Sequence, residues 1–440
     1  MAESLQPDRF AFLHIDLNSF FASVEQQLHP EYRNRPLAVV PTKADTTCCI
    51  AASYEAKALG IKTGTQVGEA KRICPEIVLV EGDHSVYAEH SHKIAEAVER
   101  CCPVAHTPSI DEMVCQLLGR EQDPPRARQI ALAIKQAIKN DVGETLRCSI
   151  GMAPNRYLAK IASDMQKPDG LIGLLPSQLP RAIAHLELRD LPGVGARTEV
   201  RLQEKGITTM EQLLALDRAG MHALWNSVWG DRMYHWLRGA VTGDDGATVA
   251  SDIQKSLGHS HVLAPEHRTP EGSWAVAHKL LHKAAMRLRM ERFHAGAMSV
   301  AIRYALTREQ AVAAKKSKKH FSGLRHSGWG MEARFAPCQD TLTLLNILRS
   351  LWAKRPDGPE FRRPFFVGVT MHNLILEDEM QATLFADPGN RAELAATMDK
   401  LNLKYGHTTL HFAGMLPARE SAPTRIAFTQ IPVQYGVDYM

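Results

Sequence analysis

The sequence has no apolar run near the ~20 residues needed to cross a bilayer. Residues 1–9 lack the apolar core of a signal peptide. The eight cysteines include no CxxC pair, and the adjacent pairs Cys48-Cys49 and Cys101-Cys102 are poorly spaced for zinc or ordinary disulfides. We therefore expect no membrane segment, reduced and buried thiols, and a cytoplasmic location.

The length and charge of the chain indicate several domains and a polyanionic partner. At 440 residues the chain is too long to fold around a single hydrophobic core, and its length alone suggests about three domains. Residues 251–375 contain 20 Lys/Arg and 9 Asp/Glu, so they carry +11, whereas the whole chain carries +4 and the remainder therefore −7. Such a locally basic module favours binding to a nucleic acid over a merely soluble surface.

Acidic residues stand at the ends of two predicted strands. Asp16 ends the apolar run 10–15, and Asp111-Glu112 follow Pro108, which favours a turn before the strand 113–118. At a turn both carboxylates can lean toward one point, and a bound divalent cation would offset their repulsion. Oxygen ligands alone suit Mg²⁺ better than zinc. The alternative is that these acids are ordinary cap or turn residues.

The first half of the chain alternates strands with helices and includes a hairpin, which predicts an α+β domain with an antiparallel sheet. In the helix 20–28, Phe20, Val24 and Leu28 form the core stripe. Phe21 lies about 100° off that stripe, so we expect its ring to face away from the core, toward whatever Asp16 binds. Further strands are predicted at 37–40 and 147–151, and helices at 53–60, 66–73, 84–101, 125–140 and 153–166.

The second half carries two signatures of nucleic-acid binding. Gly193 and Gly195 open a helix in a Gly-x-Gly turn that exposes backbone N–H groups to an anion, typical of a helix-hairpin-helix; a plain interhelical turn is the alternative. Beyond a glycine-rich linker at 240–251, the order βαββαβ predicts a small sheet backed by two helices. Its middle strands flank a basic loop, or a merely solvated one, with Lys315, Lys316, Lys318 and Lys319.

Five segments in one order resemble the Y-family, DinB/UmuC-type translesion DNA polymerases. They are Asp16 with 20–25, 53–56, 109–112, 160–165 with Lys167-Pro168, and 191–195. The resemblance implies a right-hand polymerase with palm, small fingers, helical thumb and little finger. The domains would be palm 1–28 and 84–175, fingers 29–83, thumb 176–245, little finger 250–375 and a tail 376–440, predicted to end in an extended stretch.

The resemblance also implies roles for individual residues. Asp16, Asp111, Glu112 and the Leu17 carbonyl would bind two Mg²⁺ ions, and Phe21 would be the steric gate against a ribose 2′-hydroxyl. The triphosphate would be held by Tyr54, Lys57 and Lys167; Lys57 replaces the family's usual arginine, and Ala51 a frequent threonine.

Partners are implied in the same way. Gln381, Leu384 and Phe385 resemble the clamp-binding pentapeptide of the family, although local packing against the little finger is the alternative. Besides primer-template DNA, dNTPs and the sliding clamp, the resemblance implies a UmuD-type accessory protein, a recombinase filament and a role in the SOS response, with a monomeric core.

Two other functions compete with low-fidelity translesion synthesis. A catalytically silent relative could act as a scaffold on the clamp, but such relatives lose the palm carboxylates, which this chain keeps. A nucleotidyl cyclase would have similar acids but would need neither the thumb hairpin nor the basic module.

Overall fold

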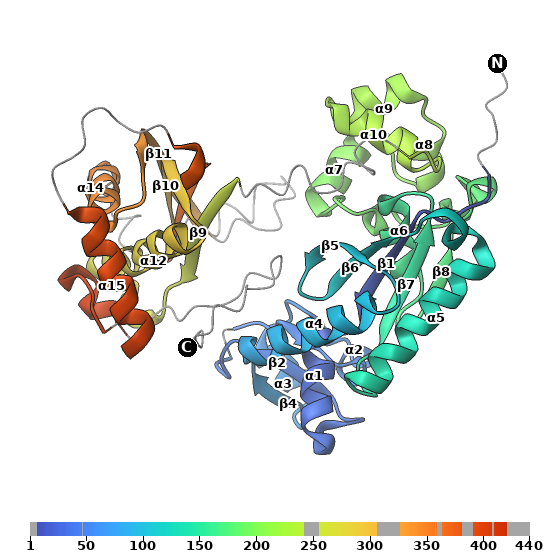
Figure 1. Ribbon diagram of the computed structural model, residues 1–440, viewed down its shortest axis with the longest axis horizontal. Coiled ribbons are helices and arrows are strands. Elements are labelled where there is room, and N and C mark those ends of the chain that lie inside the picture. The colour runs from blue at the N-terminus through green and yellow to red at the C-terminus, as the bar shows by residue number, and fades with distance from the viewer. Residues whose placement is uncertain are drawn as a thin grey trace. The chain divides into compact units, whose positions relative to one another are not determined.

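The computed structural model describes residues 7–45, 47–241, 255–305, 326–356, 358, 363–380, 390–406 and 409–419. The chain divides near residue 251 into two compact units, each described here by itself (Figure 1). Within the described ranges, no helix has the length and apolar character to span a membrane. All eight cysteines lie within these ranges as free thiols, and only Cys48 is fully exposed.

Unit 1 is built on a five-stranded sheet in the order β5-β6-β1-β7-β8. The central strand β1 is antiparallel to both β6 and β7, and β8 runs parallel to β7. Every residue of β1 is buried, as expected for a strand covered on both faces. The strands are β1 Phe12–Leu17, β5 Val104–Ser109, β6 Glu112–Gln116, β7 Cys148–Ala153 and β8 Leu171–Gly173.

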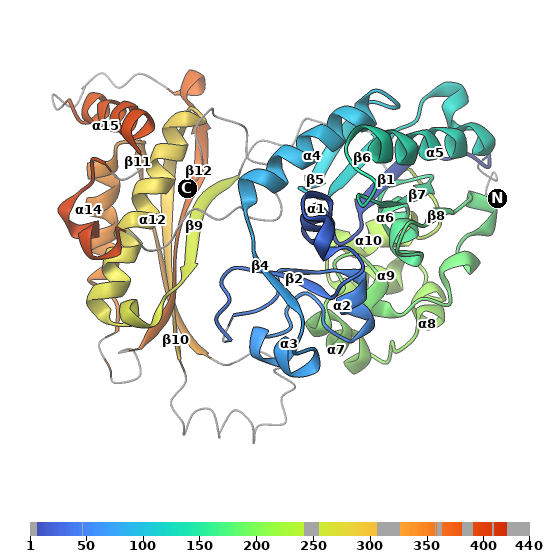
Figure 2. The same cartoon turned by 90° about the horizontal axis from the view of Figure 1, so that it is seen from below.

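Helices cover the two faces of this sheet (Figure 2). Leu13 and Ile15 pack with α1 Phe20–Leu28, α4 His84–Glu99 and α5 Pro124–Asp141. Phe12 points to the opposite face and packs with α6 Arg156–Met165. Because side chains alternate along a strand, His14 and Asp16 share the face of Phe12, toward α6. The predicted helices are confirmed, and so is the antiparallel sheet, except that β8 joins it in parallel to β7.

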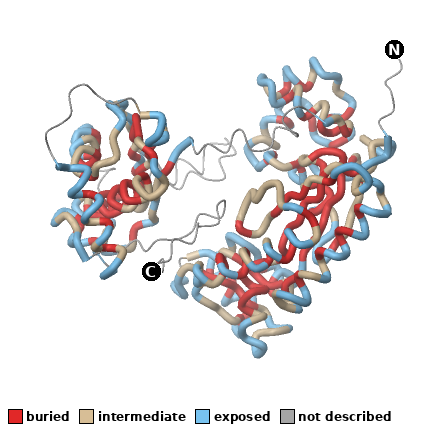
Figure 3. The backbone as a smooth tube through the Cα atoms, viewed as in Figure 1, coloured by how far each residue is buried: buried red, intermediate tan, exposed pale blue. Residues whose placement is uncertain are grey.

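A second, small sheet and a group of helices complete unit 1. The sheet has the order β3-β2-β4, formed by β2 Leu37–Val40, β3 Ala51–Ala52 and β4 Val78–Glu81, with the helices α2 Tyr54–Ala58 and α3 Val67–Ile73. The helical group shares one apolar core with α6 and consists of α7 Ala196–Glu204, α8 Met210–Leu214, α9 Arg218–Trp225 and α10 Val228–Trp236. Both regions contain buried residues (Figure 3).

Unit 2 confirms the predicted βαββαβ order. Its antiparallel sheet has the order β11-β10-β12-β9, and α12 and α14 share its core. The elements are β9 Ser256–Val262, α12 Pro270–Met290, β10 Phe293–Ala305, β11 His326–Cys338, α14 Thr341–Trp352 and β12 Pro364–Leu376.

The chain after β12 includes two helical segments that the sequence analysis did not predict, and the extended stretch predicted for its end lies outside the described residues. Residues Arg391–Tyr405 form helix α15, and a 3-10 helix follows at Ala413–Ala418. Both lie against α12, and Gly414 lies so close to His278 that an added Cβ would approach the ring to 2.7 Å. These two helical segments therefore belong to the fold of unit 2.

Candidate active site

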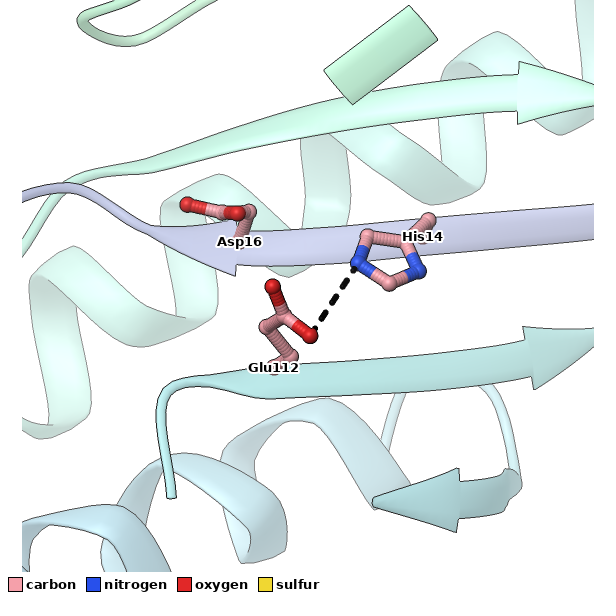
Figure 4. A group of neighbouring side chains, drawn as sticks. All are labelled: His14, Asp16 and Glu112. Carbon is pink, nitrogen blue, oxygen red and sulfur yellow. Dashed lines mark ion pairs between the residues drawn. The ribbon is translucent and has the colours of Figure 1, made fainter. Parts of the chain in front are cut away.

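Strand pairing brings Asp16 and Glu112 together. The two residues are direct partners across β1 and β6, so their side chains leave the sheet on the same face. Their carboxylates and the ring of His14 offer ligand atoms within 4.8 Å of one another (Figure 4). Asp16 is only 6% exposed. The predicted meeting of acids from two strand ends is thus seen for this pair.

Asp111 lies in the turn between β5 and β6, beside the pair. Its backbone oxygen accepts a hydrogen bond from Leu17 N at 2.9 Å, which fastens the turn to the end of β1. Its carboxylate accepts a hydrogen bond from Ser109 Oγ at 2.6 Å. Burial raises the pKa of Asp111, Ser109 opposes this, and the negative charge of Asp16 raises it further. Asp111 is therefore an electrostatic neighbour of Asp16.

His14 is a member of the site that the sequence reasoning missed. Its Nε2 lies 3.9 Å from Glu112 Oε2 and has no hydrogen-bond partner among the described residues. Burial, reinforced by Lys160, lowers its pKa to about 3, so the ring is neutral. A period of two along β1, which places His14 on the face of Asp16, is the signal that could have found it.

Two lysines of the α6 region reach the acids. Lys160 Nζ lies 2.6 Å from Asp16 Oδ2 and 2.7 Å from Glu112 Oε1, and Lys167 Nζ lies 2.6 Å from Asp16 Oδ1. Burial alone would raise the pKa of Asp16, but the two ammonium groups outweigh it and lower that pKa. For Glu112, burial outweighs Lys160 and the pKa is raised. Lys160 was not predicted as a site residue.

Helix α6 is held firmly against the sheet. The Asn155 side chain caps its N-terminus by accepting a hydrogen bond from Leu158 N at 2.9 Å. At Gly151 in β7, an added Cβ would lie only 2.0 Å from Ala159 O of the helix, so the strand and helix are in backbone contact. This contact sets how far Lys160 stands from the acids.

The residues predicted to hold the triphosphate lie at the same end of unit 1. Ser53 caps α2, whose residue Lys57 donates to Ser19 Oγ at 2.7 Å and lies 4.5 Å over the Tyr54 ring. Burial raises the pKa of Tyr54, and the charge of Lys167 opposes this, so that lysine is also a neighbour. A cavity of about 320 Å³ adjoins them, lined by Asn18, Ser23, Gln26, Arg33, Asn34, Tyr54, Glu55, Glu144, Thr145, Arg147 and Pro168.

Phe21 does not face away from the core as the helical spacing predicts. The residue is 5% exposed and belongs to the core that α1 and α4 share. Its ring stacks on Tyr87 at a centroid distance of 4.3 Å. The expected orientation is therefore wrong in this structure, because α4 covers a second side of α1. The role as a steric gate stays a prediction.

The Gly-x-Gly turn opens α7 as predicted. Gly193 has φ +87°, a left-handed conformation that favours glycine, and Gly195 is the N-cap of α7. The segment before the turn is the 3-10 helix Leu188–Asp190 instead of an α-helix. Tyr157 of α6 donates to Pro192 O at 3.0 Å and so joins this turn to the helix of Lys160.

Two predicted groups lie outside the described residues. They are the lysines of the basic loop, Lys315, Lys316, Lys318 and Lys319, and the clamp-binding residues Gln381, Leu384 and Phe385.

Comparison with known proteins gives the same family for both units. Residues 15–164 match the model of the impB/mucB/samB family, and residues 254–384 match its C-terminal domain. The chain is 31% identical to a DNA polymerase IV of Moorella thermoacetica over 92% of this chain and 95% of that protein. It is 29% identical to a DNA polymerase IV of Dehalococcoides mccartyi, over 90% and 94% of the two chains.

Solved structures share the fold. A chimera of the Y-family DNA polymerases Dbh and Dpo4 matches with a TM-score of 0.66 at 22% identity, over 83% of this chain and 99% of that one. DinB from Sulfolobus solfataricus matches with a TM-score of 0.51 at 22% identity and the same coverage. The fold is thus the right-hand fold with palm, fingers, thumb and little finger. The chain belongs to the impB/mucB/samB family of Y-family, DinB-type DNA polymerases.

Proposed function

We propose that this chain is a DNA-directed DNA polymerase that adds dNTPs to a primer 3′-hydroxyl and copies damaged template with low fidelity. The observation that carries the proposal is the buried pair Asp16 and Glu112, which faces α6 on the central strands of a Y-family fold. A catalytically silent scaffold on the clamp is not favoured, because such a protein would not need to keep these acids together.

The acids fit the divalent ions that such chemistry needs. Asp16 and Glu112 offer oxygen ligands at one point, Asp111 lies beside them as an electrostatic neighbour, and carboxylate oxygens suit Mg²⁺. We propose that they hold two Mg²⁺ ions with the help of the Leu17 carbonyl. Bound there, the ions would lower the pKa of the primer hydroxyl and neutralise charge on the transferring phosphoryl group.

The remaining residues of the site would bind and orient the substrates. Lys57, Tyr54 and Lys167 would hold the triphosphate, because two ammonium groups and a phenol gather beside the acids. Phe21 would exclude a ribose 2′-hydroxyl. The turn at Gly193 and Gly195 would bind a DNA phosphate through backbone N–H groups.

The proposal extends to domains and partners. We assign the palm to 1–28 and 84–175, the fingers to 29–83, the thumb to 176–245 and the little finger to 250–375. The basic lysines 315, 316, 318 and 319 would contact primer-template DNA. The segment 381–385 would bind the sliding clamp, and an accessory protein of UmuD type and a recombinase filament are further candidate partners.

Substitution of the acids tests the function. In Asp111→Ala and Glu112→Ala, nucleotide addition should be abolished while gel-shift affinity for primer-template DNA stays near the parent, because metal ligands act on the transition state and not on duplex binding. Glu96→Ala, an exposed acid of α4, is the control for loss of one carboxylate and should extend primers normally. Loss of DNA affinity in parallel with extension would show that the acids are structural and would refute the assignment.

A further inference from the structure

Lys160 is the cation that bridges the two acids of the cluster. Its Nζ lies between Asp16 Oδ2 at 2.6 Å and Glu112 Oε1 at 2.7 Å, and 3.2 Å from Asp164 Oδ2 on its own helix. The side chain is 22% exposed, so water screens these contacts only in part. Among the described residues, Lys160 alone forms ion pairs with both Asp16 and Glu112.

The backbone of Lys160 cannot move freely away from the acids. The contact of Gly151 with Ala159 O anchors the helix one residue before Lys160. The Asn155 cap and the hydrogen bond from Tyr157 to Pro192 O hold the preceding turn. The ammonium group is therefore part of the built site, on a helix whose distance from the sheet is set by backbone contact.

Lys167 differs from Lys160 in position and in partners. It follows the C-cap residue Gln166, and it forms ion pairs with Asp16 and Asp164 but none with Glu112 among the described residues. Lys167 is also an electrostatic neighbour of Tyr54 and Lys57, the other residues proposed to bind the triphosphate. The triphosphate would therefore be an alternative anionic partner for Lys167. Lys160, by contrast, contacts both Asp16 and Glu112.

We propose that Lys160 is a positioning residue that bridges the carboxylates of Asp16 and Glu112 and keeps the affinity of their site for divalent cations low. The inference rests on the proposed function, because it assumes that these acids bind the metal. With Asp111, three carboxylates contribute three negative charges, and Lys160 offsets one of them. A fixed ammonium group also repels an incoming divalent ion, so the ion binds reversibly and can leave with the product.

The test measures the binding of Mn²⁺ alone to the full chain, without DNA or nucleotide. The electron paramagnetic resonance signal of the free ion reports how much Mn²⁺ remains unbound. Lys160→Met should raise the affinity for Mn²⁺ by at least about tenfold, the lower end of what a unit charge at contact distance exerts on a divalent ion. Lys160→Arg keeps the charge and should bind as the parent does. Lys93→Met, on the exposed face of α4, removes one positive charge elsewhere and should change nothing.

A second readout, the melting temperature, shows whether the Lys160→Met variant is folded. Asp16 keeps Lys167 as a partner when Lys160 is removed, so the variant should fold. Its melting temperature should be lower than that of the parent in EDTA, and it should rise more on addition of Mg²⁺, because tighter binding stabilises the folded state more. Lys160→Gln is the alternative if the methionine variant does not fold.

The outcomes separate this inference from the proposed function. Unchanged or weaker Mn²⁺ binding in Lys160→Met and Lys160→Gln would overturn the role of Lys160. This holds even if the separate variant Asp16→Ala no longer binds Mn²⁺. If Asp16→Ala leaves Mn²⁺ binding intact, the metal assignment itself fails, and this inference fails with it.

Discussion

Replacing Gly151 with alanine tests how far the active site depends on the contact between β7 and α6. The added Cβ would lie 2.0 Å from Ala159 O, 2.4 Å from Ser163 N and 2.8 Å from Ala162 Cβ. The nearest two are backbone atoms, so no side-chain rotation relieves the overlap. The helix would have to move out by about 1 Å, and overpacking of this kind costs about 3 kcal/mol of the free energy of unfolding.

The same movement should reach the chemistry. Lys160 follows Ala159 directly and lies 2.6 Å from Asp16, so a shift of about 1 Å would break that contact. A misplacement of this size can lower the rate about 100-fold. Urea unfolding, monitored by circular dichroism, would measure the stability. Single-turnover primer extension would measure the rate.

Gly330→Ala is the matched control for this substitution. Gly330 also lies in a strand, β11, but an added Cβ would meet only Val300 O, at 3.4 Å. Stability and extension should therefore stay close to the parent. If Gly151→Ala loses less than about 1 kcal/mol and extends primers normally, the tight contact between β7 and α6 is not what positions Lys160.

Three further predictions concern the sugar gate, the clamp and pH. Phe21→Ala should increase the ratio of ribonucleotide to deoxyribonucleotide extension. Because the buried ring stacks on Tyr87, the substitution should also lower the free energy of unfolding by about 3 kcal/mol. An unchanged ratio with normal activity would leave Phe21 only a packing role. Leu384→Ala with Phe385→Ala should leave extension by the free enzyme unchanged and remove stimulation by loaded clamp, and full stimulation of the double variant would disprove tethering. Burial lowers the pKa of His278 and of His282 from 6.5 to about 4, so the folded state binds fewer protons than the unfolded state between these values. Unit 2 should thus be destabilised as pH falls from 6.5 to 4, by about 2 kcal/mol for each ring, and His282→Phe should flatten the pH dependence of its melting temperature; an equal slope in the variant would refute this.

Local signals were enough to predict the acids and the order of elements. Asp16 ends an apolar strand and Asp111 follows a proline turn, so both positions depend on residues within a few places along the chain. The βαββαβ order of unit 2 likewise follows from alternating periods of two and 3.6.

Features that depend on tertiary packing could not be predicted in this way. Lys160 reaches Asp16 across 144 residues of sequence, and only the contact of α6 with β7 brings them together. The direction of Phe21 was wrong because the helical stripe assumes a single core face, whereas every residue from 20 to 25 is buried. Helix α15 was missed because few of its residues are buried, with no clear stripe to mark it.

The ion pair between α12 and α15 determines where a working fragment of unit 2 has to end. Arg289 and Asp399 pair at 2.6 Å with side chains 10% exposed, and Arg289 also donates to Gln339 O at 2.6 Å. A fragment that stopped at residue 384, where the family match ends, would leave the Arg289 charge without its carboxylate and uncover His278. Removing one partner of a buried pair costs about 3–5 kcal/mol. A fragment of unit 2 cut from this chain should therefore include Arg419, whose backbone oxygen accepts a hydrogen bond from Lys279.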